Sequence, residues 1–244
     1  MPSGDVDQWP AAPRRIVSLV PSLTETVAVS APELLVGVTD WCTHPAELDA
    51  ARVGGTKNPR TDDVVRLRPD VVLANSEENR GVDLDALRSA GVPVWVTDYE
   101  TVPDALAGLA ELLAMLGLGH PQWLSEAEAA WAGIWSGPRC TALVPIWRRP
   151  WMAVGRDTFM GDMLRRLGVD NVLSASEERY PRVDLETVPA HDVVVLPDEP
   201  YAFDETDGPE AFSVPARLVS GRHLTWYGPS MAEAAEVLTR QLWP

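Results

Sequence analysis

The segment WRRPW at residues 147–151 places two arginines between two tryptophans. Two guanidinium groups flanked by indole rings form a planar, cationic and π-rich surface, which suits an anionic or carboxylate-bearing ligand with a flat ring system. We therefore predict that Trp147, Arg148, Arg149 and Trp151 bind a ligand. The alternative is a loop in which the indoles pack onto the rest of the protein and the arginines pair with carboxylates.

Tryptophan is unusually common in this chain, with 10 Trp against 4 Tyr and 3 Phe. Cores are built mainly from Leu, Ile, Val and Phe, because a buried indole N–H needs a hydrogen-bond partner. The excess therefore indicates exposed aromatic surface, and several of these tryptophans stand beside Pro or Arg in expected loops.

The segment WCTHP contains Cys42 and His44, a thiol and an imidazole two residues apart. These two residues supply too few ligands for a structural zinc site, which needs four. The other histidines are not spaced as metal ligands are. We expect no resident metal and no cofactor, and take Trp41 and His44 as ligand-binding candidates. Motif searches find no GxSxG, Walker, HExxH or GxGxxG sequence, so no catalytic residue is expected.

Further candidates follow expected strands, because sites in α/β sheets lie beyond the carboxyl ends of the strands. The segment NSEENR offers hydrogen-bonding groups for amide or hydroxyl edges of a ligand, or is a solvated turn. The segments HLTWYGP and LPDEPYAF offer aromatic walls, or pack internally; the acidic run after Tyr201 lacks EF-hand spacing. The candidates in NSEENR are Glu77, Asn79 and Arg80, and those in the two aromatic segments are Tyr201, Trp226 and Tyr227. The loop at residues 56–60 adds Lys57 and Asn58.

Composition restricts the partners. The chain has 244 residues, 45% hydrophobic and 23% charged, and a net charge of −16 that repels nucleic acid and anionic lipid. No apolar run is long enough to span a membrane. Two cysteines give no disulfide framework, and the start lacks a secretion signal. We expect a monomer in the cytoplasm, or outside it if the sequence is a mature form.

Strand and helix patterns alternate through most of the chain, which predicts mostly parallel sheets covered by helices. Strands are expected in RRIVSLVPS, VGVTDW, residues 70–74, residues 92–97, CTALVPIW and HDVVVLP. Helices are expected over residues 61–67 and 82–90. Other helices are expected to be capped by Ser22 with Glu25, by Asp157 and by Ser230.

Residues 103–135 keep a helical spacing of apolar residues, interrupted at Pro121, and predict one long helix or two in near continuation. We therefore expect an α/β fold of two Rossmann-like lobes with parallel sheets, joined by a backbone helix. The expected parts are an N-terminal lobe (1–101), the helix (102–136) and a C-terminal lobe with a closing helix (137–244). A weak internal repeat supports two lobes, since RTDDVVRLRPDVVLA resembles RVDLETVPAHDVVVLP. Each segment is expected to contain an acidic helix start, a short apolar helix, an Asp and a buried strand.

Taken in order, RRIVSLVPSLTE, VGVTDWCTHP, VGGT, LRPDVVLA and GVPVW resemble the class III substrate-binding proteins of ABC transporters, over nearly the whole chain. These helical-backbone metal receptors bind cobalamin, ferric siderophores or haem, and the cobalamin type is most similar. The resemblance implies a ligand in the cleft between loops that follow the strands, which adds Ser22 to the candidates. It also implies that one acidic residue on each lobe docks onto a membrane permease, at Asp62 and Glu186.

Three hypotheses follow. The preferred one is a non-catalytic binding protein for a corrinoid, with ferric siderophore or haem less favoured. The second is an intracellular enzyme that uses Cys42 and His44 with Glu77 or Glu78 in the same cleft. The third is a sensor whose acidic docking residues contact another protein.

Overall fold

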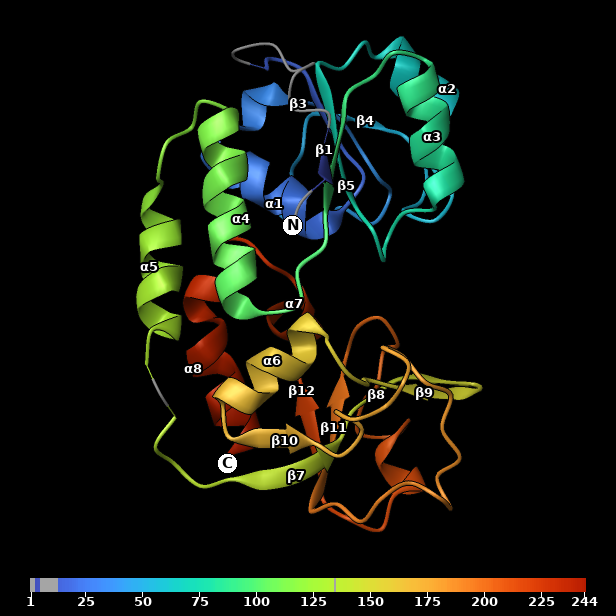
Figure 1. The fold of residues 1–244 in the computed structure, drawn as a ribbon, viewed down its shortest axis with the longest axis vertical. Helices are drawn as coiled ribbons and strands as arrows, with labels where there is room; N and C mark the ends of the chain where they lie inside the picture. The colour runs from blue at the N-terminus through green and yellow to red at the C-terminus, as the bar shows by residue number, and fades with distance from the viewer. Residues whose placement is uncertain (1–2, 5–12, 134) are drawn as a thin grey trace. The chain divides into compact units, whose positions relative to one another are not determined.

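A computed structural model describes residues 3–4, 13–133 and 135–244, which form two compact units. Unit 1 comprises Met1–Tyr99, Ala105–Ser125 and Tyr227–Pro229, and unit 2 comprises Glu100–Asp104, Glu126–Trp226 and Ser230–Pro244. Each unit contains a sheet of parallel strands covered by helices (Figure 1), which confirms the expected two-lobed α/β class.

The sheet of unit 1 has the strand order β1-β6-β5-β2-β3-β4. Its strands are β1 (Ser3–Gly4), β2 (Ile16–Ser18), β3 (Leu35–Val38), β4 (Ala51–Arg52), β5 (Val71–Asn75) and β6 (Val94–Thr97). Only β1 runs antiparallel, along the edge of β6. The central strands β2, β5 and β6 are fully buried because helices cover both faces of a parallel sheet.

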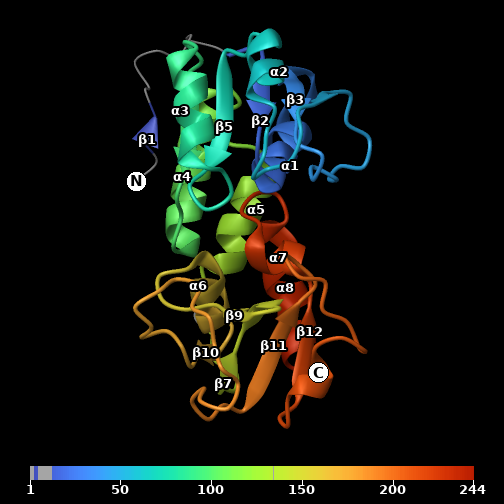
Figure 2. The same cartoon turned by 90° about the vertical axis from the view of Figure 1, so that its right-hand side faces the viewer.

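The helices of unit 1 are α1 (Pro21–Ser30), the 3₁₀ turn η2 (Pro32–Leu34), α2 (Thr61–Arg66) and α3 (Gly81–Ser89). Helices α2 and α3 lie side by side (Figure 2), and Val64, Leu84 and Leu87 pack into a core with sheet residues such as Val72 and Val94. Burying each such side chain contributes about 1.5–3 kcal/mol.

The expected capping box at the start of α1 is wrong. The helix begins at Pro21, directly after Val20 in extended conformation, and no side chain caps it. Proline at the first helical position needs no N–H partner and has a helical φ, so it starts the helix without a cap. Ser22 and Glu25 are therefore buried residues within the helix.

The sheet of unit 2 has the all-parallel order β10-β7-β11-β12. Its strands are β7 (Cys140–Leu143), β10 (Val169–Asn171), β11 (Val193–Pro197) and β12 (Ala216–Val219), and a separate hairpin is formed by β8 (Pro145–Arg148) and β9 (Trp151–Ala153). The segment CTALVPIW, expected as one strand, is thus divided between the sheet and the hairpin at Val144. Helix α8 (Met231–Leu242) packs beside β12 (Figure 2).

Helices α6 (Phe159–Arg166), α7 (Gly221–Thr225) and the 3₁₀ turn η3 (Pro209–Ala211) complete unit 2. The expected cap Asp157 is wrong: the hydroxyl of Thr158 accepts a hydrogen bond from the Gly161 amide at 3.2 Å, while Asp157 adopts φ +49° outside the helix. Ser230 does precede α8, but its side chain makes no capping bond.

Of the two alternatives expected for residues 102–136, the structure has two helices and not one: α4 (Val102–Met115) and α5 (Gln122–Trp131). Helix α4 ends where Gly117 adopts φ +73° and the Leu118 amide bonds to the Leu113 carbonyl, a Schellman-type stop that favours glycine. Helix α4 begins within unit 2 and enters unit 1, and α5 returns to unit 2. The three-part division of the chain stays a prediction.

The repeat is confirmed only for its strands. Both β5 and β11 are fully buried strands, as the comparison of the two segments predicts. The first copy contains α2, but the second has no helix: its residues 184–187 form a turn, in which the Thr187 amide bonds to the Asp184 carbonyl at 3.0 Å. Among the described residues, no helix has both the length and the apolarity needed to cross a bilayer.

Asp162 of α6 anchors the start of α4 inside unit 2. Its carboxylate accepts hydrogen bonds from the Val102 amide at 2.9 Å and from Arg166 Nε at 2.7 Å, and it pairs with Arg165. Burial alone would raise the pKa of Asp162, but these hydrogen bonds outweigh burial and hold its pKa below the ordinary value. The ionised form is therefore the one that stabilises the fold.

We expect Asp162→Asn to lower the free energy of unfolding at pH 7 by about 2 kcal/mol, because the side chain is nearly buried and two arginines lose their partner. The difference from the wild type should persist above about pH 4 and disappear as the pH falls through the lowered pKa. Urea unfolding at several pH values measures both effects.

The matched control is Asp170→Asn, whose exposed pair with Arg139 should contribute less than about 0.5 kcal/mol. Equal losses in the two variants, or an Asp162→Asn difference that grows in acid, would contradict the anchoring role.

Candidate functional site

Five aromatic side chains of unit 2 form a continuous group, which we call the aromatic cluster. Its contacts join Trp147 to Tyr201 edge-to-face at 5.5 Å, Tyr201 to Phe203 at 4.6 Å, and Trp151 to both Phe203 at 6.0 Å and Phe212 at 5.4 Å. Trp147 is 43% exposed, whereas Phe203 is buried and Trp151 is half-buried. The cluster thus supports the Trp147 ring from behind and leaves part of it open to solvent.

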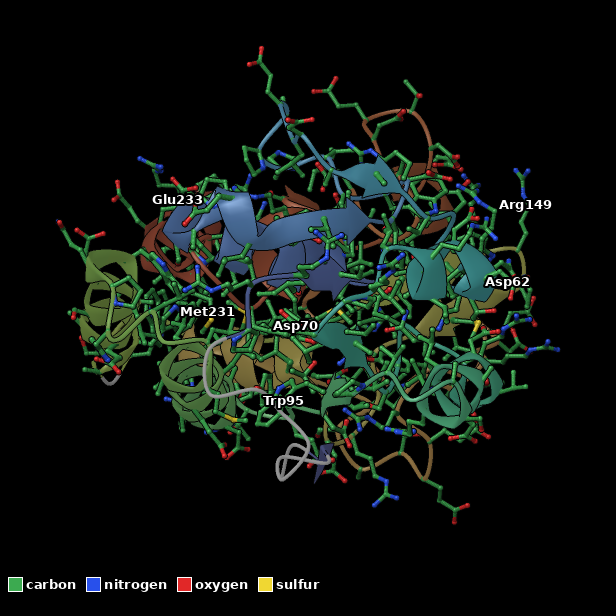
Figure 3. The ribbon with its side chains drawn as sticks, turned by 90° about the horizontal axis from the view of Figure 1, so that it is seen from above. Asp62, Asp70, Trp95, Arg149, Met231 and Glu233 are labelled. Atoms are coloured by element: carbon green, nitrogen blue, oxygen red, sulfur yellow. The ribbon has the colours of Figure 1, made fainter. Side chains whose placement is uncertain are left out.

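The two arginines between these tryptophans have different roles. Arg148 is mostly buried and pairs with Asp207 and Glu210, and its guanidinium lies 5.5 Å from the Trp151 ring centre. The alternative interpretation, pairing with the chain's own carboxylates, is therefore correct for Arg148. Arg149 is exposed and projects beyond the ribbon (Figure 3), with no ion pair to any described residue.

A pocket of about 440 Å³ lies beside the hairpin β8–β9. Its lining residues are Met152, Ser176, Glu177, Glu178, Tyr180, Pro181 and Arg182. Met152 is the ladder partner of Trp147, so the two side chains project from the same face of the hairpin. The pocket is therefore adjacent to the exposed indole.

Sequence reasoning missed this pocket. The segment that lines it follows β10, at the carboxyl end of a parallel strand. The rule that selected NSEENR after β5 applies equally here, and Tyr180 and Arg182 have the aromatic and cationic character sought elsewhere. The segment was not selected because β10, with the sequence VDN, is too short to show a strand pattern, so no strand was expected before it.

Most of the predicted residues of unit 1 lie on the loops after β3, β4 and β5, strands of one sheet in which β2 stands between β3 and β5. Trp41 is 67% exposed. Its indole lies over Gly55 in the loop after β4, since a Cβ atom added to that glycine would be 3.5 Å from the indole Nε1. Lys57 donates a hydrogen bond from Nζ to the Glu77 carbonyl, which ties two of the loops together. Exposed His44 and Asn58 lie on the same loops.

Other predicted residues are buried or already engaged. Trp226 donates from Nε1 to Glu199 at 3.0 Å, and the Tyr227 hydroxyl lies 2.7 Å from Thr97 Oγ1, where burial raises the tyrosine pKa. Arg80 is exposed but forms an ion pair with Asp83 at 2.8 Å. The segment HLTWYGP, expected as a loop, begins inside α7, which ends at Thr225, and only its residues 226–229 lie outside the helix.

Ser22 and Asn79 are buried as well, each 4% exposed. Ser22 lies in the first turn of α1, where its carbonyl accepts from the Thr26 hydroxyl at 2.9 Å. A role in ligand contact stays a prediction for all of these residues.

Cys42 is fully buried, with its Sγ 3.0 Å from the Thr24 hydroxyl and 3.2 Å from the Thr39 hydroxyl. Burial raises the pKa of the thiol above its ordinary value, and the hydrogen bonds offset only part of this effect. A protonated, enclosed thiol is a poor nucleophile and a poor metal ligand. Within the described part of the chain, no three His, Cys, Asp or Glu side chains are grouped to hold a metal ion.

The two acidic residues expected to dock onto a permease are both exposed. Asp62 lies in the first turn of α2, and Glu186 lies in the turn that replaces the second expected helix. Neither side chain has an ion-pair partner among the described residues, whereas neighbouring Asp63 pairs with Arg60 and Arg66. Their charges are therefore available to a partner.

Comparisons with known proteins identify relatives over nearly the whole chain. Over 248 residues the chain is 24% identical to the vitamin B12-binding protein of Pectobacterium carotovorum, covering 95% of this chain and 89% of the relative. It is 28% identical over 262 residues to an uncharacterized ABC transporter substrate-binding lipoprotein of Bacillus subtilis, covering 95% and 81%. No family model matches.

Among solved structures, a periplasmic haem-binding protein from Roseiflexus has the same fold, with a TM-score of 0.78 at 21% identity. The match covers 94% of this chain and 98% of the other. Similarity at this level of identity shows the arrangement of the backbone alone.

The burial of Cys42 gives a direct chemical test. We expect Ellman's reagent at pH 8 to leave Cys42 unmodified in the native protein and to modify both cysteines after unfolding in guanidinium, because only an exposed thiolate reacts. Cys42→Ser is the control, and its native-state reaction should equal that of the wild type. Rapid reaction that is lost in Cys42→Ser would restore the enzyme hypothesis.

Proposed function

Since the chain belongs to the class III substrate-binding proteins, as a distant homologue over nearly its full length, we propose that it binds a metal-bearing or metal-chelating small molecule, with a corrinoid favoured. Proteins of this family are non-enzymatic and bind substrates for ABC transporters. The enzyme hypothesis has no support from Cys42, which is enclosed. We also propose that it acts outside the cytoplasm, because similar proteins include a periplasmic haem-binding protein and a substrate-binding lipoprotein.

The observation that carries this proposal is the exposed Trp147 beside the pocket at Met152. An indole that is held by Tyr201 and open on its other side has a flat apolar surface, which is costly to leave in water. A planar macrocycle would cover this surface. Its substituents would then reach the polar groups of the pocket.

The charges around this surface favour a ligand without net negative charge. Arg148 is neutralised by Asp207 and Glu210, so only Arg149 remains as an unpaired cation of WRRPW. The lining of the pocket contains two acidic residues, Glu177 and Glu178, and one basic residue, Arg182. Amide groups, which both donate and accept hydrogen bonds, match such a mixed lining better than carboxylates do. Corrinoid side arms end in amides, whereas haem carries two propionates.

Titration with cobalamin, cobinamide, haem and ferric siderophores, followed by Trp fluorescence, tests the proposal. We expect a corrinoid to quench the emission at micromolar concentration or below. Trp147→Ala should weaken its affinity by at least about tenfold, or about 1.4 kcal/mol, because the stacking surface is lost. No quenching by any of these compounds would contradict the proposal.

The matched control is Trp135→Phe, because Trp135 stacks on Trp243 at 5.9 Å and does not line the pocket. This variant should bind like the wild type. Equal losses in the two variants would mean that Trp147 acts only through stability.

Charge can be tested separately. We expect cobalamin affinity to change less than about twofold when NaCl rises from about 50 to about 500 mM, because little net charge is screened. Haem should bind more weakly than cobalamin. Tighter binding of haem, together with a strong salt dependence, would assign the site to a carboxylate-bearing ligand instead.

We further propose that an ABC permease is the partner and that Asp62 and Glu186 dock onto its basic groups. Reversing each charge, in Asp62→Lys and Glu186→Lys, should weaken association with permease-containing vesicles by about tenfold or more at low salt, while cobalamin binding stays unchanged. Asp85→Lys is the control, since Asp85 pairs with Arg88 on α3. Unchanged association in both variants would remove these residues from the interface.

A further inference from the structure

The side-chain amide of Asn79 has both of its N–H donors and its oxygen engaged by groups of the protein itself. Its Nδ2 donates to the Leu19 carbonyl at 3.3 Å and to the Thr56 carbonyl at 3.0 Å, and its Oδ1 accepts from the Asn75 amide at 2.9 Å. Both N–H donors are therefore used, and the side chain is buried. These three bonds join the loops after β2 and β4 to the end of β5.

Asn75 extends this connection to the next strand. Its Oδ1 accepts from the amides of Glu77 at 2.9 Å and Glu78 at 3.0 Å, and its Nδ2 donates to the Thr97 carbonyl at 3.0 Å. The turn that carries Glu77 and Glu78 is thus fixed to β6 by one buried amide and to the loop of Thr56 by the other.

Unit 2 repeats the arrangement at Asn171, the last residue of β10. Its Nδ2 donates to the carbonyls of Val154 at 2.8 Å and Gly155 at 3.1 Å, and its Oδ1 accepts from the Leu173 amide at 3.0 Å. The Gly155 amide in turn donates to the Arg179 carbonyl at 2.7 Å, within the segment that lines the 440 Å³ pocket. A Cβ atom on Gly155 would lie 2.1 Å from the Glu178 carbonyl oxygen, so this segment is fitted against Gly155.

We propose that Asn79 and Asn171 are positioning residues, one in each unit, that fix the loops carrying the ligand-contacting side chains. Asn79 fixes the loop of Lys57 and the turn of Glu77, and Asn171 fixes the segment of Tyr180 and Arg182. Neither amide touches the ligand. The inference rests on the proposed function for the identity of the ligand, but the positioning role concerns the loops themselves.

Asparagine suits this task because one side chain donates twice and accepts once in a small volume. The loop carbonyls that it satisfies lie inside the protein, where an unpaired carbonyl costs about 1–3 kcal/mol. A carboxylate at the same place would present oxygen atoms to two carbonyl oxygens. Replacement of the amide by its acid therefore turns the two attractive contacts into repulsive ones, with almost no change in shape.

The experiment uses Asn79→Asp and Asn171→Asp in the full chain, with cobalamin affinity measured at about pH 8 and about pH 5. Burial beside two carbonyl oxygens raises the pKa of the new carboxyl, so the lower pH favours its protonated form. A protonated carboxyl donates one hydrogen bond and restores part of the connection. We expect affinity to fall at least about tenfold at pH 8 and to recover to within about threefold of the wild type at pH 5.

The charged groups around Asn79 are Lys57 and Arg60 on one loop and Glu77, Glu78 and Arg80 on the turn, with His44 on the neighbouring loop. The wild type, measured at both pH values, corrects for any contribution from these groups. Ala90→Asp is the control, because it adds the same charge at an exposed position of unit 1 outside the candidate loops.

A readout without ligand separates this inference from the proposed function. In Asn79→Asp, amide hydrogen exchange over residues 54–58 and 76–80 should be faster than in the wild type at pH 8 and should approach it at pH 5. If the wild type bound none of the probes, the proposed function would fail, and the exchange experiment would still decide the positioning role.

Wild-type affinity and exchange in both variants at pH 8, or a loss that is equal at the two pH values, would overturn the inference. Asn79→Ser serves if Asn79→Asp does not fold, because it removes the bonds without adding charge. It should show fast exchange at both pH values, and protection equal to the wild type would likewise overturn the inference.

Discussion

Parallel strands bring all their carboxyl ends to one edge of a sheet, and the loops that leave this edge need partners for their main-chain polar groups. In this protein, buried side-chain amides meet part of that need. Asn79 and Asn75 in unit 1, and Asn171 in unit 2, bond to carbonyls and amides of several loops at once. The shape of each edge, and hence the position of the loop of Lys57 or of the pocket at Met152, depends on these bonds.

The sequence predicts the sheets well because buried parallel strands are apolar runs rich in branched residues. The cores of RRIVSLVPS, LRPDVVLA and HDVVVLP appear as β2, β5 and β11. Helix starts were predicted less well, since serine and aspartate signal a cap only when the backbone allows it. Pro21 begins α1 without a cap, and Asp157 takes a positive φ one residue before the true cap. The break after α4 depends on Gly117, a signal present in LAMLGLGHP but weaker than the apolar periodicity around it.

The candidate site was predicted less completely than the fold, because exposure depends on distant segments. Arg148 is neutralised by Asp207 and Glu210, some 60 residues along the chain, and no local pattern indicates that pairing. Trp226 has the same residue type as Trp41, yet Glu199 satisfies its indole inside unit 2 while Trp41 stays exposed. The expected excess of open aromatic surface is thus confined, among the described tryptophans placed in the site, mainly to Trp41 and Trp147.

The assignment of residues to the two units follows an interleaved path along the chain. Unit 1 takes residues from the start of the chain, from α4 with the beginning of α5, and from the three residues Tyr227–Pro229 between α7 and α8. Neither unit is a contiguous stretch of sequence. A gene split anywhere between codons 105 and 226 would therefore encode two fragments that each lack residues of both units.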